Sequence, residues 1–68
     1  MTLGQKIRNF RVDKGLCVKA FAKELGYSDY AVSSWEKNKI VPNKYALEDL
    51  SFYMGISVDE LMKGVDER

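Results

Sequence analysis

Several residue types that support catalysis, metal binding or cross-linking are scarce in this sequence of 68 residues. It has no histidine and a single cysteine, Cys17, so it lacks both an intrachain disulfide and the ligands of a structural zinc site. No apolar run approaches the roughly 20 residues that cross a bilayer, and there is no signal-peptide pattern. A histidine base and a glycine-rich phosphate loop are missing as well. These absences predict a cytoplasmic protein that is not an enzyme and that has no metal and no cofactor.

An excess of charge of one sign is also missing. Eleven Lys and Arg residues stand against ten Asp and Glu residues, for a formal net charge of +1, which by itself is a weak indication of nucleic-acid binding. The charge is unevenly distributed, because residues 1–40 carry a net +4 and residues 41–68 a net −3. Such a split is compatible with a polyanion on one side of the molecule and another partner on the other side.

The positions of glycine divide the chain into helices. An apolar content of 46% supports a packed core, and the length predicts a single domain, residues 1–68. Four of the five glycines follow a stretch with helical apolar periodicity, where a left-handed cap is expected. No segment alternates as a strand would, so the predicted fold is all-α with five helices. These are expected over about residues 3–14, 18–25 and 28–37, then after Pro42–Asn43 and from Ser57.

The second and third expected helices are separated only by the residues 26–28. Two short helices joined so closely cross at a steep angle, and Ala22 provides the small side chain that close contact needs. Phe21 and Val32 supply apolar anchors on the two sides of the turn. This pattern predicts a helix-turn-helix, whose second helix projects outward to enter the major groove of DNA.

An ordered set of motifs without gaps extends over nearly the whole chain. This set resembles the Cro/CI-type (XRE-type) helix-turn-helix family of phage and bacterial regulators. The resemblance implies a compact lambda-repressor-like domain, strongest over residues 3–62, that binds operator DNA as a homodimer and regulates transcription. It also implies an ion pair between Arg11 and Glu36 that ties the first helix to the third. The motifs are LGQKIRNFR (3–11), Gly15–Leu16, FAKELGYS (21–28), VSSWEKNK (32–39), Pro42 and, after Leu47 and Leu50, MGISVDELM (54–62).

The family's geometry assigns two kinds of DNA contact to this chain. The outward positions of the third helix, which are expected to read bases, are Asp29, Tyr30, Ser33 and Ser34. Arg, Asn and Gln make the most informative base contacts and are missing from this set, so the predicted sequence specificity is modest. Where the family usually has a polar side chain at the start of the second helix, Val18 leaves only its backbone N–H for phosphate. The expected contacts to the DNA backbone are Val18, Lys19, Ser28, Lys37, Asn38, Lys39, Asn43 and Lys44.

A group of apolar residues in the C-terminal half stands where related chains usually carry polar residues. Exposed aromatic residues are typical of protein interfaces, although one or two of these four side chains would instead complete a small core. One interpretation is a symmetric dimer through the fourth and fifth helices. A second is an antirepressor-like modulator that docks on another repressor, and a third is a structural or toxin–antitoxin adaptor. The four residues are Tyr45, Phe52, Tyr53 and Val58.

Overall fold

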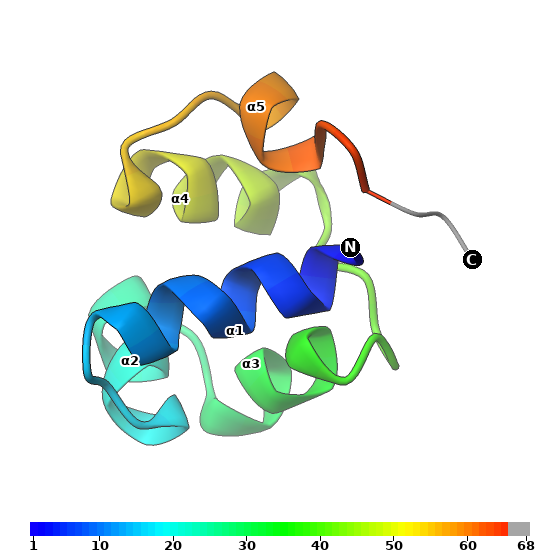
Figure 1. Ribbon diagram of the computed structural model, residues 1–68. Coiled ribbons are helices and arrows are strands. Elements are labelled where there is room, and N and C mark those ends of the chain that lie inside the picture. Colours follow the sequence, from blue (N-terminus) through cyan, green and yellow to red (C-terminus); the bar gives the residue numbers. More distant parts are fainter. Residues whose placement is uncertain (66–68) are drawn as a thin grey trace.

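Five helices form in residues 1–65, which are the residues that the computed structural model describes (Figure 1). The all-α prediction is confirmed, and the expected bounds differ from the observed ones by at most one residue. Residues 66–68 of the expected domain lie outside the described residues. Within residues 1–65 no helix is long and apolar enough to cross a membrane. The helices are α1 (Leu3–Asp13), α2 (Val18–Leu25), α3 (Asp29–Glu36), α4 (Lys44–Met54) and α5 (Val58–Met62).

Each helix begins at a short polar side chain that accepts a hydrogen bond from the backbone N–H three residues later. These caps satisfy one of the N–H groups that a helix start leaves without a partner. Cys17 acts in this way in α2, because its Sγ atom accepts from the backbone N–H of Ala20 at 3.4 Å. The five N-caps are Thr2, Cys17, Ser28, Asn43 and Ser57.

The core is built where α1 lies between two pairs of helices. In Figure 1, α1 crosses the middle of the molecule, with α2 and α3 on one side and α4 and α5 on the other. Complete burial of a side chain such as Ile7, Phe21 or Leu50 contributes about 1.5–3 kcal/mol. The helices α3 and α5 pack against α1, while α2 and α4 contact each other directly. The buried apolar residues are Leu3, Ile7, Phe21, Ala22, Val32, Trp35, Ala46, Leu50 and Leu61.

Tyr53 is half-buried and packs against this core, in agreement with the alternative that one or two of the four candidate partner residues complete the core. Its ring lies 5.9 Å from that of Phe10 and 5.5 Å from that of Phe21, both in edge-to-face geometry. Such pairs contribute about 0.5–1.5 kcal/mol beyond the burial of area. Its hydroxyl donates a hydrogen bond to Glu24, which raises the pKa of Tyr53. The aromatic cluster thus joins α4 to both α1 and α2.

The short helix α5 is held by a lysine from the opposite end of the chain. The ammonium group of Lys6 donates to the carbonyl oxygen of Leu61 at 2.8 Å and to the carbonyls of Glu60 and Lys63. These carbonyls lie at the C-terminal end of α5, where a cation is favoured and backbone acceptors lack helical partners. A helix of five residues is unstable alone, so α5 depends on this contact and on the burial of Leu61.

Candidate nucleic-acid interface

The pair α2 and α3 is packed tightly across its turn. Ala22 is buried against α3, and the left-handed backbone of Gly26, with φ at 88°, ends α2 within one residue. The ring of Tyr27 packs edge to face on Trp35 at 5.2 Å, and its hydroxyl donates to Asp49 of α4 at 2.7 Å. This bond raises the pKa of Tyr27. The turn is thereby anchored to both α3 and α4, which orients α3 as a unit.

A buried ion pair connects α1 to the end of α3. The Nε and Nη2 atoms of Arg11 donate to the two carboxylate oxygens of Glu36 at 2.7 and 3.0 Å, and Nη1 donates to the carbonyl of Leu16 at 2.8 Å. The side chains are only 11% and 6% exposed. The hydrogen bond to Glu36 raises the pKa of Arg11. A bidentate pair of this kind restrains direction as well as distance, so it holds the angle of α3 relative to α1.

A second contact between α1 and α3 is so close that only glycine fits. A Cβ atom on Gly4 would lie 2.5 Å from the carbonyl oxygen of Trp35. The N–H of Gly4 donates to the side-chain oxygen of Asn38 at 3.1 Å, and the amide nitrogen of Asn38 donates to Thr2 at 3.1 Å. Asn38 has a left-handed backbone, with φ at 60°, which asparagine tolerates better than most residues. Its side chain therefore holds the loop after α3 to α1, a role that sequence reasoning did not anticipate; a glycine at the second position of an expected helix was the available signal.

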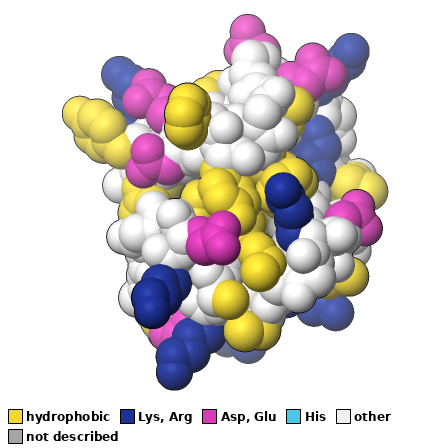
Figure 2. Space-filling view, turned by 90° about the vertical axis from the view of Figure 1, so that its left-hand side faces the viewer, with side chains coloured by type: hydrophobic (Ala, Val, Ile, Leu, Met, Phe, Trp, Pro, Cys, Tyr) yellow, Lys and Arg dark blue, Asp and Glu magenta, His cyan; other side chains and the backbone are white. Residues whose placement is uncertain are grey.

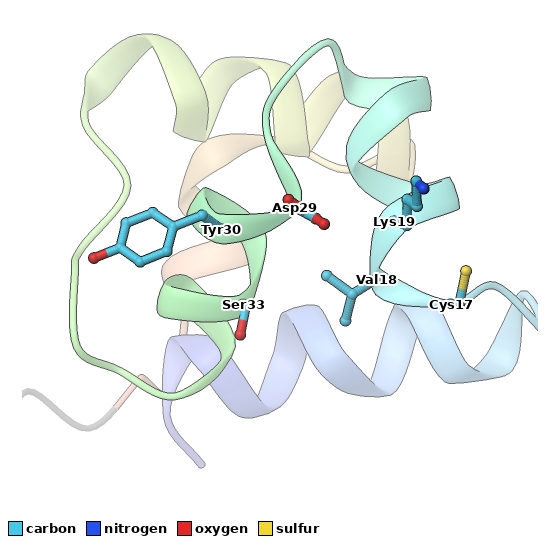
Figure 3. Close-up of a pocket in the computed structure, with 6 residues that line it drawn as sticks. All are labelled: Cys17, Val18, Lys19, Asp29, Tyr30 and Ser33. Atoms are coloured by element: carbon cyan, nitrogen blue, oxygen red, sulfur yellow. The ribbon is translucent and has the colours of Figure 1, made fainter.

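The outward side of α3 and the start of α2 form one open hollow (Figure 3). In this view Val18 points from α2 toward α3, while Tyr30 points outward from the opposite side. Tyr30 is 71% exposed, Asp29 is exposed and Ser33 is half-buried. Residues that were expected to contact bases and residues that were expected to contact the DNA backbone thus share one surface. The lining residues are Cys17, Val18, Lys19, Asp29, Tyr30 and Ser33.

The outward placement expected for Ser34 is wrong. Its exposed fraction is 5%, next to the buried Trp35. The reason is that α3 packs against α1 as well as α2, so the inward arc of this eight-residue helix is wide enough to include Ser34. Three of the four candidate base-reading residues remain on the surface.

Polar and basic residues lie on both sides of the hollow. Lys19 is exposed on α2, and Lys37, Lys39 and Lys44 are exposed in or next to the loop after α3. Ser28 and Asn43 are exposed too, although their side-chain oxygens already cap α3 and α4. In residues 1–65 no group of three or more potential ligands could hold a metal ion.

A closely packed helix pair with an exposed second helix between lysines defines a helix-turn-helix domain of the DNA-binding class. The profile of the helix-turn-helix family matches residues 7–61. The chain belongs to this family, in its Cro/CI (XRE) type, whose members are DNA-binding transcriptional regulators and not enzymes.

Individual relatives agree with this assignment. Over 64 residues the chain is 33% identical to the HTH-type transcriptional activator BcrR of Enterococcus faecalis, covering 94% of this chain but 31% of BcrR. The chain therefore spans about a third of the length of that relative. The P22 c2 repressor in complex with synthetic operator 9T superposes with a TM-score of 0.85 at 34% identity, covering 94% of this chain and 97% of that one. A SinR/SinI protein complex gives a TM-score of 0.81 at 30% identity, covering 93% and 62%.

Proposed function

We propose that this chain regulates transcription in the cytoplasm of a prokaryotic or phage-infected cell by placing α3 in the major groove of an operator. The observation that carries the proposal is the surface formed by α2 and α3, in which exposed side chains of α3 stand between basic residues. The similarity to the operator-bound P22 c2 repressor supports it. The ion pair of Arg11 and Glu36 holds α3 in the orientation that insertion requires.

Three side chains of α3 would read bases. Asp29 accepts a hydrogen bond from the amino group of cytosine, Tyr30 packs on the methyl group of thymine, and the hydroxyl of Ser33 bonds to either type of base. A good base contact contributes about 1–3 kcal/mol of discrimination. Because Ser34 is buried, the set is smaller than the sequence predicts, and discrimination is correspondingly modest.

The flanking groups would hold the DNA backbone. Lysines at both ends of the surface neutralise phosphates. The first backbone N–H groups of α2, including that of Val18, would bind a phosphate without the help of a side-chain donor. Two copies of the chain would occupy an operator whose half-sites lie about 34–36 Å apart, one helical turn. The proposed phosphate contacts are Val18, Lys19, Ser28, Lys37, Lys39, Asn43 and Lys44; Asn38 contributes by holding the loop.

The test is duplex selection followed by a salt series. A preferred duplex is selected from a random pool, and its affinity is measured by fluorescence anisotropy at several salt concentrations. Tyr30→Ala should relax the base preference, whereas Lys39→Ala should weaken all duplexes alike and reduce the salt slope by about one. Lys63→Ala is the matched control, because α5 and α3 lie on opposite sides of α1 (Figure 1), and it should change neither quantity. Equal effects of the Tyr30 and Lys39 variants would contradict these assignments.

A second candidate function is a protein-binding modulator that docks on another regulator. The exposure of Tyr45 and Phe52, at 70% and 89%, favours it. Val58, the fourth candidate partner residue, is half-buried at the start of α5. The structural similarity to a chain in the SinR/SinI protein complex is in agreement with it. Absence of any preferred duplex at low salt, together with a stable complex with another repressor, would favour this function over operator binding.

A further inference from the structure

The outward side of α4 carries two acids between two aromatic residues. Tyr45, Glu48, Asp49 and Phe52 are all exposed and follow the spacing i, i+3, i+4, i+7. At this spacing the side chains form one stripe along a helix, about 10 Å long. We call these four residues the α4 stripe. Leu50, on the other side of the same helix, is completely buried, so the stripe has no part in the core.

The aromatic ends of the α4 stripe are exposed to an extent that requires an explanation. Phe52 is 89% exposed, the highest fraction among the exposed large apolar residues, and Tyr45 is 70% exposed. A single exposed apolar side chain is ordinary, but two aromatic residues on one stripe are typical of a surface that binds protein. The hollow beside α3 does not account for them, because neither Tyr45 nor Phe52 lines it.

The two acids at the centre of the stripe are not neutralised within the fold. Among residues 1–65 no cation lies within ion-pair distance of Glu48 or Asp49. The carboxylate of Asp49 accepts a hydrogen bond from Tyr27 at 2.7 Å, which fixes its position. Residues 41–65 contain two lysines and four acidic residues, and Figure 2 shows acidic side chains concentrated in its upper part, where α4 and α5 lie. The stripe therefore attracts positive charge.

A second copy of this chain does not match the α4 stripe. If two copies of α4 pack antiparallel about a two-fold axis, Tyr45 meets Phe52 of the other copy, but Glu48 meets Asp49. If they pack parallel, each acid meets its own equivalent. Both symmetric arrangements bring four carboxylates together at the centre of the contact, where like charges are destabilising.

We propose that the α4 stripe is the docking site for a helix of another protein, and that this helix presents two basic residues between two apolar residues. Such a helix places its apolar side chains against Tyr45 and Phe52 and its ammonium or guanidinium groups against Glu48 and Asp49. The stripe begins next to Lys44, a proposed phosphate contact, and Asp49 is bonded to Tyr27 in the turn before α3, so this partner would lie close to bound DNA. The proposal does not depend on operator binding.

A designed peptide tests the proposal without DNA. The probe is a stapled helix of about 15 residues with leucines seven positions apart and lysines at the third and fourth positions between them. The control peptide has glutamates in place of the lysines. Titrated into the ¹⁵N-labelled full chain, the basic peptide should shift the amides of α4 and bind at least about tenfold more tightly than the acidic peptide.

Variants assign the binding to the stripe. Phe52→Ser should abolish binding of the basic peptide, whereas Val12→Ser, which removes an apolar side chain that is 53% exposed on α1, should leave it unchanged. Glu48→Lys should also abolish peptide binding and, because it places an ammonium group opposite Asp49 of a second copy, should strengthen self-association in sedimentation equilibrium by about tenfold. Equal affinity for the two peptides, or self-association of the unmodified chain that Phe52→Ser removes, would overturn the proposal.

Discussion

Arg11→Ala removes three hydrogen bonds at once, two to Glu36 and one to the carbonyl of Leu16. It also leaves the carboxylate of Glu36, whose side chain is 6% exposed, without a counter-charge. Breaking one side of a buried pair costs about 3–5 kcal/mol. A domain of this length has a total stability of about 3–10 kcal/mol, so the variant should be at the edge of folding. Arg11→Lys keeps the charge without the bidentate geometry, so its stability should lie between that of the unmodified chain and that of Arg11→Ala.

Urea denaturation followed by circular dichroism at neutral pH provides the assay. The hydrogen bond to Glu36 raises the pKa of Arg11 above its ordinary value. The contribution of the ion pair to stability is therefore fully present at neutral pH and is lost only when the pH is high enough to deprotonate the guanidinium group. The double variant Arg11→Met with Glu36→Met leaves no buried charge and should be more stable than Arg11→Ala. If the losses of the two single methionine variants simply add in the double variant, the two side chains are not coupled, and the ion pair is not what joins α1 to α3.

Two further predictions concern the contacts of α1 and of the turn before α3. Gly4→Ala should destabilise the domain by about 1–3 kcal/mol in urea, although alanine favours helix, because the added Cβ meets the carbonyl of Trp35; an unchanged midpoint would contradict this. The hydrogen bond to Asp49 raises the pKa of Tyr27, so the folded state favours the neutral phenol. Its contribution is complete below pH of about 10 and is lost as the pH rises through the raised pKa. In thermal melts between about pH 8 and 11, the melting temperature of the unmodified chain should fall, and that of the Tyr27→Phe variant should fall less. An equal fall in the two chains would argue against this role of the Tyr27 hydroxyl.

Local features of the sequence were sufficient to predict the helices. The apolar period of 3.6 residues, the polar caps such as Thr2 and Cys17, and the turn at Gly26 are each decided by residues within a few positions of one another. Backbone hydrogen bonding in a helix is local too, so five helices with nearly correct bounds follow from the sequence. The resemblance to the Cro/CI type added their arrangement and the pairing of Arg11 with Glu36, which are 25 positions apart.

The faces that each helix buries were decided only by the tertiary structure. Tyr53 and Phe52 are neighbours in sequence, yet Tyr53 packs against Phe10 while Phe52 is 89% exposed. Ser34 is buried because α3 has two neighbouring helices instead of one, and Gly4 is required because α1 meets the end of α3 there. These outcomes depend on contacts between distant segments, whose geometry no local pattern encodes. The sequence by itself thus determined the helices and the class of regulator, whereas the packing around α1 selected which residues remain on the α3 surface and on the α4 stripe.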